Sequence, residues 1–284
     1  MKVVLAGAYG HLGSDIFREL LKQGHEVVAA DVVERDLGLE GNFVFKKLDV
    51  TNPEALKGLC DGADAVITTV GLTKASKTVT NMDIDYQGNL NLLREAKRAG
   101  VRTFDYVSVF KCNLAPKDVP IVYAKYLFET ELLKSGMNFN IFRPTGYFYD
   151  IVHVFTPMVE KGQAQLLGKE PVSANVIATE DLAEFIVAHM NDGKGQFDIG
   201  GKETYTYEEI AKMCFEAAGK PLVIKRYPAW VFSMLAGVSK LAKNGKEPII
   251  RFSKWTLTHD MTAPIKYGNR SFKAYIEASF RKEK

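Results

Sequence analysis

The chain has 284 residues, with 37 Lys and Arg against 34 Asp and Glu, which leaves a formal net charge of +3. A composition of 46% hydrophobic and 25% charged residues is that of a globular protein and excludes a disordered chain. The charge comes without a basic stripe interleaved with aromatic residues, so we expect no nucleic-acid partner.

The cysteines, the histidines and the apolar runs indicate which classes of globular protein we do not expect. The three cysteines, Cys60, Cys112 and Cys214, are too few and too scattered for a disulfide scaffold, and the five histidines lack ligand spacing, so we expect no metal. The first predicted strand begins at Val3, which leaves no room for a signal peptide. The longest apolar stretch, residues 229–237, is well short of the roughly 18–20 residues of a membrane span. We therefore expect a cytoplasmic protein with no membrane partner, as a monomer or homodimer.

The first half of the chain alternates short apolar runs with helical patterns. Such runs, with little polar alternation, are typical of strands buried on both faces of a parallel sheet. The predicted strands span residues 3–6, 26–30, 43–48, 65–69, 104–108 and 139–142.

Helix signals fill the gaps between these strands. Leu12, Ile16 and Leu20 recur at helical spacing before a stop at Gly24. Asn52 and Pro53 open a short helix with a capping residue and a proline in its first turn. A further helix is predicted over 89–99, with basic residues in its last turn.

The pattern becomes less regular after Pro144. A helix is predicted from Thr179, and Thr206 with Glu209 forms a capping box for a helix over 207–218. A later helix carries an apolar face, which we expect to pack in the protein's own core rather than cover a pocket, a partner or a membrane. That face is made of Trp230, Val231, Met234, Leu235, Val238 and Leu241.

Repeated strand–helix–strand units predict an α/β fold with a doubly wound parallel sheet. We assign residues 1–150 to this Rossmann-type domain and 151–284 to a smaller, mainly helical substrate-side portion. The segment near 172–200 is expected to return to the sheet.

A glycine-rich turn joins the first strand to the first helix. Gly7, Gly10 and Gly13 have G-x-x-G-x-x-G spacing, a variant of the dinucleotide fingerprint. Gly7 permits a tight turn, Gly10 lets the backbone approach a pyrophosphate, and Gly13 lets the helix pack closely on the strand. The helix N-terminus then offers N–H groups and a positive dipole to the phosphates.

Two acids follow the next two strands. Asp31 can accept hydrogen bonds from an adenosine ribose and would repel a 2′-phosphate, which favours NAD over NADP. Arg35 leaves NADP open, because it could fold over a 2′-phosphate. Asp49 can bind an adenine amino group, or can merely cap the helix that begins at Pro53.

These residues resemble the extended and atypical short-chain dehydrogenase/reductase superfamily, and the likeness extends over most of the chain. It includes Asp49-Val50, Thr69-Val70-Gly71, the stretch 88–96, Tyr106-Val107-Ser108, Arg143-Pro144-Thr145-Gly146 and the segment 178–183. Within this superfamily, the sequence most resembles the NmrA-like, isoflavone-reductase-like and divinyl-reductase-like branch. The resemblance implies that an NAD(P) cofactor is bound by Gly7, Tyr9, Gly10, His11, Leu12, Gly13, Asp31, Asp49, Val50, Thr69, Val70, Gly71, Lys125 and Pro144.

The ordinary family's acid pair is missing. Its chemistry rests on Tyr-x-x-x-Lys plus a serine, in which the lysine lowers the tyrosine's pKa. Lys125 fits the lysine, but Ile121 stands where the tyrosine belongs, and Tyr123 points to another helix face. Val109 or Phe110 takes the usual serine position. The catalytic candidates that remain are Lys125, Tyr147 and Ser108, while Cys112 has no spaced partner to activate it.

Two functions follow from this pattern. The first is an NAD(P)-dependent reductase or epimerase-like enzyme whose small-molecule substrate, apolar or aromatic, lies against Tyr147 and Phe148. The second is a non-catalytic regulator that senses dinucleotides, or an assembly protein. We favour the enzyme on family analogy.

Overall fold

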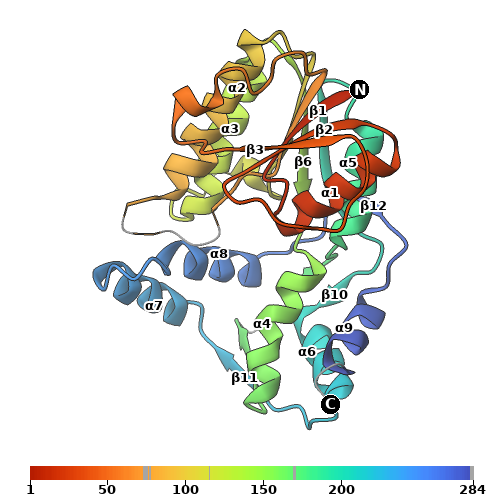
Figure 1. The fold of residues 1–284 in the computed structure, drawn as a ribbon. Coiled ribbons are helices and arrows are strands. Elements are labelled where there is room, and N and C mark those ends of the chain that lie inside the picture. Colours follow the sequence, from red (N-terminus) through yellow and green to blue (C-terminus); the bar gives the residue numbers. More distant parts are fainter. Residues whose placement is uncertain (73–75, 77, 115, 169–170, 282–284) are drawn as a thin grey trace. The chain divides into compact units, whose positions relative to one another are not determined.

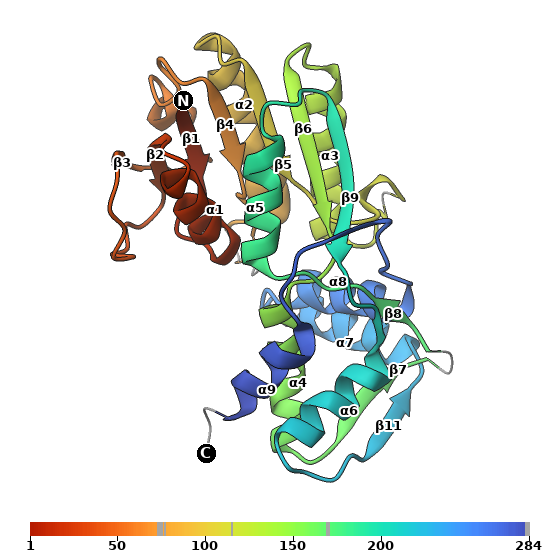
Figure 2. The ribbon, with the colours of Figure 1, turned by 90° about the vertical axis from the view of Figure 1, so that its right-hand side faces the viewer.

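The computed structural model describes residues 1–72, 76, 78–114, 116–168 and 171–281. They divide into two compact units, one of Met1–Arg143 with Leu182–Phe197 and one of Pro144–Asp181 with Asp198–Lys284 (Figures 1 and 2). The chain thus leaves the first unit at Pro144 and re-enters it at Leu182, whereas the sequence analysis divides the chain once, at 150/151.

The main sheet has eight strands. They are β1 (Lys2–Ala6), β2 (Glu26–Asp31), β3 (Phe43–Lys47), β4 (Ala65–Thr68), β5 (Thr103–Val107), β6 (Asn138–Pro144), β9 (Gly195–Gly201) and β12 (Ile265–Tyr267). Their order is β12-β9-β6-β5-β4-β1-β2-β3, and neighbouring strands from β3 to β6 pair in parallel. The predicted doubly wound α/β sheet is confirmed, and each of the six predicted strands has its counterpart.

Helices cover both faces of the sheet in the first unit (Figure 1). Helices α1 (His11–Lys22) and α5 (Thr179–His189) lie on one face, and α2 (Asn89–Arg98) and α3 (Pro120–Lys134) lie on the other. Apolar residues at helical spacing form the buried side of α1, and Gly24 at φ +76° follows its end. Between the sheet and α2 and α3 lies a core in which Val4, Val66 and Phe104 meet Leu92 and Phe128.

A π-helical segment, η2 (Met82–Gly88), precedes α2 and is absent from the sequence prediction. Gly88 is there for packing, because a Cβ at this position would lie 2.5 Å from Cγ2 of Val50. Gly88 therefore lies inside a continuous helical segment formed by η2 and α2. The absence of a side chain there lets the loop that carries Val50 approach this segment.

Two short 3₁₀ helices complete the first unit, η1 (Pro53–Leu56) and η3 (Cys112–Leu114). The Asn52 side chain accepts a hydrogen bond from the backbone N–H of Glu54 (3.1 Å), so the predicted cap is confirmed.

Farther along the sheet, Arg143 on β6 donates to Glu129 on α3 through both Nε and Nη2, and this buried ion pair joins helix to strand.

The second unit is smaller and mainly helical. Its elements, besides β12 and the end of β9, are α4 (Phe148–Glu160), β7 (Ala164–Leu167), β8 (Ser173–Ala174), β10 (Tyr205–Thr206), α6 (Tyr207–Ala217), β11 (Ile224–Tyr227), α7 (Trp230–Leu241), α8 (Glu247–Thr258) and α9 (Phe272–Arg281). Strand β10 pairs with β8 and β11 pairs with β7. The capping box of Thr206 and Glu209 is confirmed at the start of α6.

The expectation that α7 buries its apolar face is wrong. Trp230, Met234, Val238 and Leu241 are all exposed, whereas the small residues Ala236 and Ser239 are buried. Helix α7 packs on α8, and short side chains on the packed side let the two helices approach. The apolar stripe is thereby left on the outside.

Asp105, in the middle of β5, is a carboxyl group in the core of the first unit. Its Oδ1 accepts a hydrogen bond from Nδ2 of Asn140 (2.6 Å), and its Oδ2 has no partner among the described residues. Burial raises the pKa of Asp105 well above its usual range, and the charge of Asp192 adds to this effect.

The raised pKa gives a testable dependence of stability on pH. The unfolded chain releases this proton at about pH 4, whereas the folded chain keeps it, so Asp105 makes the protein less stable as pH rises past about 4. We expect Asp105→Asn to raise the melting temperature by a few degrees at about pH 8 and to have no such effect near pH 4. Thermal unfolding at the two pH values measures this. Asp118→Asn, an exposed control, should shift neither midpoint, and an equal gain for Asp105→Asn at both pH values would contradict the assignment.

Candidate functional site

The candidate site lies at the carboxyl ends of β1, β4 and β5. The strand order places β2 and β3 on one side of β1, and β4, β5 and β6 on the other. Loops leaving β1 and β4 therefore diverge, and ligands of open α/β sheets bind at such a switch point. Gly7 follows β1, Thr69 follows β4 and Ser108 follows β5, so the predicted motifs meet at one edge of the sheet.

The glycine turn has a different requirement at each of its three positions. Gly7 has φ +82°, and a Cβ there would lie 2.5 Å from Oγ1 of Thr69. A Cβ on Gly13 would lie 1.9 Å from the carbonyl oxygen of Gly7, so only glycine lets α1 approach β1 this closely. A Cβ on Gly10 would meet only that same oxygen, at an ordinary 3.4 Å.

Gly10 is therefore not required by the packing of the protein itself. It is exposed, it is the N-cap residue of α1, and it has no side chain to cover the N–H groups of the first helical turn. A phosphate fits this arrangement, because the turn leaves the helix N-terminus accessible where a methyl group would stand in the way. The residues present thus fit the pyrophosphate of a dinucleotide.

Asp31 lies at the end of β2, beside this turn. Its Oδ2 accepts a hydrogen bond from the Tyr9 N–H (2.9 Å), and its Oδ1 accepts one from the Val32 N–H (2.7 Å). A carboxylate has about four acceptor positions, so lone pairs remain for a ribose hydroxyl. Asp31 both holds the turn and presents a negative charge at its outer end.

Three predicted cofactor residues of the turn differ in exposure. The side chains of Tyr9 and Leu12 are buried, and the Tyr9 ring packs edge-on against Phe17 and Phe45. His11 is exposed at the first position of α1.

Asp49 and Val50 follow β3. Asp49 is exposed, and its Oδ1 accepts hydrogen bonds from the backbone N–H and Oγ1 of Thr51. These bonds stabilise the turn that follows β3. The alternative reading of Asp49 as the cap of η1 is wrong, because Asn52 fills that position. Val50 is buried, and its carbonyl oxygen accepts a hydrogen bond from Nδ2 of Asn91 (3.0 Å).

The segment after β4 links the glycine turn to the rest of the site. Oγ1 of Thr69 donates to the carbonyl oxygen of Gly7 (3.1 Å), which fixes the turn against β4. A Cβ on Gly71 would lie 2.9 Å from Oδ1 of Asp85 and 3.2 Å from Nζ of Lys125. Gly71 therefore lies directly against the ion pair that these two side chains form.

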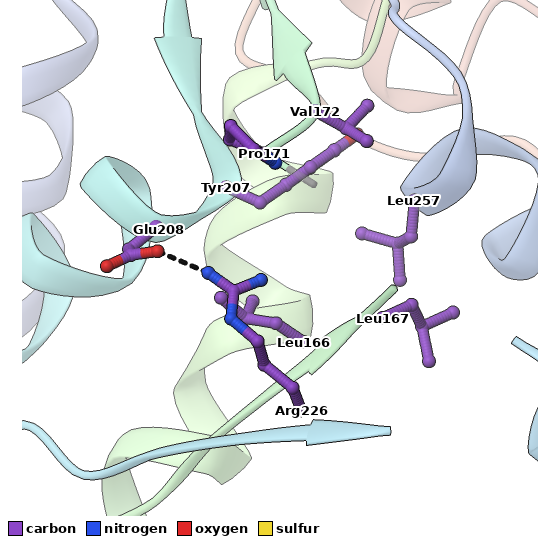
Figure 3. Close-up of a pocket in the computed structure, with 8 residues that line it drawn as sticks. All are labelled: Leu166, Leu167, Pro171, Val172, Tyr207, Glu208, Arg226 and Leu257. Carbon is purple, nitrogen blue, oxygen red and sulfur yellow. Dashed lines mark hydrogen bonds and ion pairs between the residues drawn. The ribbon is translucent and has the colours of Figure 1, made fainter. Parts of the chain in front are cut away.

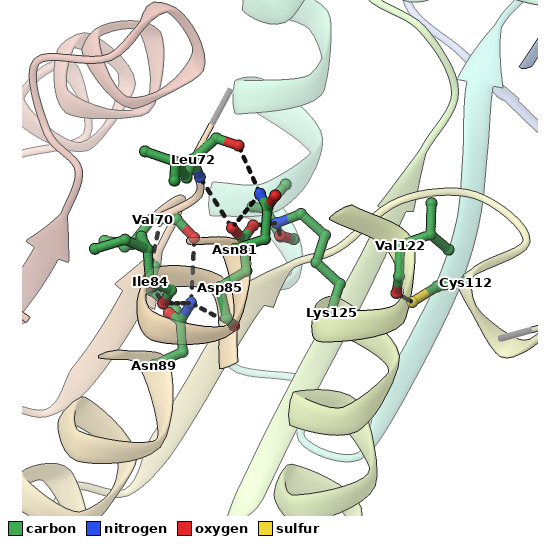
Figure 4. Close-up of polar contacts among 11 residues, drawn as sticks. Val70, Leu72, Asn81, Ile84, Asp85, Asn89, Cys112, Val122 and Lys125 are labelled. Carbon is green, nitrogen blue, oxygen red and sulfur yellow. Dashed lines mark hydrogen bonds and ion pairs between the residues drawn. The ribbon is translucent and has the colours of Figure 1, made fainter. Parts of the chain in front are cut away.

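Lys125 is mostly buried and ion-paired (Figure 4). Only 12% of its side chain is exposed, and its Nζ lies 3.3 Å from Oδ1 of Asp85 and 3.5 Å from the Val107 carbonyl oxygen. It also lies 5.3 Å from the centre of the Tyr106 ring. An ammonium group has three N–H bonds; the Val107 carbonyl oxygen accepts one of them, and the contact with Oδ1 of Asp85 is an ion pair.

Asp85 is the site residue that the sequence analysis missed. It lies on η2, fully buried, and its Oδ2 accepts hydrogen bonds from the Leu72 N–H and from Nδ2 of Asn81, both at 3.0 Å. Asn89 ties the same helical segment to the loop after β4 by donating to the Val70 carbonyl oxygen. An acid between the apolar residues Ile84 and Tyr86 was the available signal, but the segment carries no recognisable strand or helix pattern.

Ser108 and Cys112 lie on the β5 side of the site. Oγ of Ser108 is buried without a partner among the described residues, and Sγ of Cys112 contacts the Val122 carbonyl oxygen. Burial raises the pKa of Cys112, and the charge of Glu129 adds to the rise, so this group stays a thiol.

No tyrosine stands in the family position on α3. Ile121 is buried there, and Tyr123 stacks on Tyr126 with ring centres 6.4 Å apart. Tyr106 lies nearer to Lys125, but its hydroxyl is buried, and burial raises its pKa well above the usual range. Such a tyrosine is a weaker acid than the activated tyrosine of the ordinary family.

Tyr147 and Pro144, the remaining predicted residues, belong to the second unit. Tyr147 is the N-cap residue of α4 and stacks on Tyr149. Burial raises its pKa, and the charges of Asp150 and Tyr149 add to the rise. Phe148 packs on Phe272 in this unit's core. The roles of Tyr147 and Pro144 stay predictions.

A small pocket lies elsewhere in the second unit (Figure 3). Leu166, Leu167 and Leu257 form its apolar part, and Arg226 and Glu208 form an ion pair at its edge. None of the predicted site residues lines it. Within the described ranges, no group of three or more His, Cys, Asp or Glu is arranged to hold a metal ion.

Comparisons with known proteins place the chain in a family. Residues 7–193 match the NAD(P)H-binding family, over a range that includes the glycine turn, Asp85 and Lys125. The photosystem II assembly factor Ycf39 of Synechocystis sp. is 24% identical over 267 residues, which cover 90% of this chain and 76% of that protein. The chloroplastic divinyl chlorophyllide a 8-vinyl-reductase of Oryza sativa subsp. indica is 28% identical and is covered over 68% of its length, with 86% of this chain aligned.

A solved structure shares the fold over nearly the whole chain. The NADPH-dependent quinone oxidoreductase QOR2 of Escherichia coli, in complex with NADPH, superposes with a TM-score of 0.74 at 17% identity, covering 99% of this chain and all of that one. With a family match over more than half of its length, the chain belongs to the NAD(P)H-binding family of atypical short-chain dehydrogenases/reductases.

Proposed function

We propose that the protein is an NAD(H)-dependent reductase of the atypical class, in which Lys125 serves the reaction without a tyrosine. The observation that carries this proposal is the buried Lys125–Asp85 pair, which lies at the same edge of the sheet as the glycine turn. Burial of a charged pair is costly and adds little to stability, so its presence at a ligand edge favours a functional role.

The bound nicotinamide would supply a hydride, and the chain's own residues would orient it and handle the proton. Asp85 and the Val107 carbonyl oxygen hold the ammonium of Lys125 in one place. Its remaining N–H bonds would be available to the nicotinamide ribose and the reacting group of the substrate. Lys125, rather than a tyrosine, would then deliver the proton that accompanies hydride transfer.

We assign NAD rather than NADP as the cofactor because of Asp31. Its carboxylate would accept a hydrogen bond from the 2′-hydroxyl of the ribose and would repel a 2′-phosphate. Arg35 is exposed nearby in the chain and makes no hydrogen bond or ion pair within the described residues. The charge with a fixed position beside the turn is therefore the negative charge of Asp31, which two backbone N–H groups hold.

For the substrate we infer a small molecule that is apolar or aromatic. The related chloroplastic reductase acts, by its name, on divinyl chlorophyllide a, a substrate of this kind. The three cysteines are free and buried, which supports the expected location in a reducing compartment such as the cytoplasm, and we keep a monomer or homodimer as the expected assembly.

A non-catalytic role is the second candidate. Ile121 in place of the tyrosine favours it, as does the likeness to photosystem II assembly factors. In that role the chain would bind a dinucleotide and a protein partner without transferring hydride.

The glycine turn gives the first test. We expect Gly10→Ala to weaken NADH binding by about tenfold or more, because the added methyl group stands where the pyrophosphate approaches. The melting temperature should not fall, since that methyl group meets no protein atom closer than 3.4 Å. Gly237→Ala, with open space around it in α7, is the matched control. Fluorescence titration with NADH measures both variants, and unchanged binding to Gly10→Ala would contradict the phosphate site.

Asp31 gives a test of cofactor choice. We expect Asp31→Asn to weaken NADH binding by about tenfold and to strengthen NADPH binding, because it removes a charged acceptor and a repulsive charge together. Titration with both nucleotides measures the ratio, with Glu40→Ala as a control for a nearby lost charge. Parallel losses for the two nucleotides would point to a damaged turn instead of a changed preference.

Lys125 gives the test of catalysis. With menadione as a flat apolar acceptor, we expect Lys125→Met to lower kcat for NADH oxidation by about 100-fold. Lys134→Met, on the exposed end of the same helix, should leave kcat unchanged. NADH binding without oxidation by menadione or by other quinones and enones would favour the assembly role.

Asp85 is a positioning residue in this scheme, which a double-mutant cycle checks. Asp85→Asn should lower kcat in the wild-type background and should have no further effect in Lys125→Met, because it acts through the lysine. Additive losses in the two backgrounds would show that Asp85 only stabilises the fold.

A further inference from the structure

Helix α7 turns its apolar side outward. The exposed fractions are 63% for Trp230, 53% for Met234, 58% for Val238 and 85% for Leu241. These positions follow one another at intervals of three or four residues, so they form a single stripe, and Leu235 (44%) borders it. A contiguous apolar stripe on the outside of a protein marks a binding surface.

The packing of the helix shows that this orientation is fixed. Ala236 and Ser239, on the opposite side of α7, are buried, and Nζ of Lys254 on α8 donates to Oγ of Ser233 on α7 (2.8 Å). The two helices form an antiparallel hairpin (Figure 1), and α8 also contacts β7. Turning the stripe inward would break this contact and expose the packed side.

The charges of the hairpin identify the occupant. From the start of α7 to the end of α8 there are five cations and one acid, and the acid, Glu247, is bound to Arg251 (2.8 Å). The other four cations are Lys240, Lys243, Lys246 and Lys254. The net charge of the whole chain is only +3, so positive charge is concentrated in this hairpin.

We propose that the α7 stripe docks onto the surface of a bilayer that contains anionic lipid. Trp, Met, Val and Leu on one side of a helix with lysines beside them is the pattern of a helix that lies in the membrane interface. The helix has 12 residues and is thus about 18 Å long, which is shorter than the roughly 30 Å of a hydrocarbon core. No helix in the described part of the chain is long and apolar enough to cross a membrane.

A second copy of the chain suits this surface less well. A twofold contact through the α7 stripe would bring together two hairpins of the same net positive charge, and like charges across an interface are repulsive. Anionic lipid headgroups supply the opposite sign. This inference replaces the sequence-based expectation of a protein without a membrane partner, and it does not depend on the proposed reductase activity.

Two tryptophans make the proposal measurable. Trp230 is exposed in the stripe, whereas Trp255 on α8 is buried. With vesicles of phosphatidylcholine containing one third phosphatidylglycerol, we expect a blue shift of tryptophan emission and co-sedimentation of the full-length protein. The shift should vanish in Trp230→Phe, which should still sediment. Phosphatidylcholine alone should bind at least tenfold more weakly.

Substitutions separate the apolar and the charged contributions. Val238→Glu combined with Leu241→Glu should abolish sedimentation, while Val223→Glu, an exposed apolar control on another segment, should not. Lys240→Gln with Lys243→Gln should weaken binding about fivefold for each charge removed, and Lys225→Gln should have no effect. Circular dichroism and NADH binding check that each variant remains folded.

Several outcomes would overturn the proposal. These are failure of the wild type to bind the anionic vesicles, equal binding to phosphatidylcholine alone, and unchanged binding of the double glutamate variant. A stable dimer that Val238→Glu dissociates, with no binding to lipid, would assign the stripe to a second copy instead.

Discussion

The close approach of α1 to β1 is the constraint on which the site depends. Because Gly13 has no side chain, the helix lies against the Gly7 carbonyl oxygen, closer than any Cβ allows. Thr69 then fixes Gly7 from β4, and Asp31 holds the Tyr9 N–H from β2. Three neighbouring strands thus hold one turn, and the helix N-terminus is left accessible, as a phosphate-binding site requires.

A second rigid arrangement stands on the other side of the switch point. Asp85 on the π-helical segment holds the loop after β4 through Leu72 and holds Lys125 on α3. The lysine, which in the ordinary family works beside a tyrosine, here has a buried acid as its partner. In the proposed function, Lys125 would contact the nicotinamide ribose as it does in the ordinary family, while Asp85 instead of a tyrosine would stand beside it.

The two units use burial in opposite ways. The first unit buries ionisable side chains, at Asp85, Asp105 and the Glu129–Arg143 pair, each with at least one polar contact. The second unit leaves large apolar side chains of α7 exposed while it buries the small ones. The Lys125–Asp85 ion pair and the exposed apolar surface of α7 are both costly, and the proposed cofactor and bilayer would account for them.

The sequence by itself determined the α/β sheet, its six leading strands, the glycine turn, Asp31 and Lys125, because strand runs, glycine spacing and chain order are local signals. It also showed that Ile121 replaces the tyrosine. Only the tertiary structure decided that Asp85 partners Lys125, because residues 40 positions apart meet only once α3 lies beside η2. It likewise decided that the α7 stripe faces outward, since helical periodicity shows that a face is apolar and not which side packs on a neighbour.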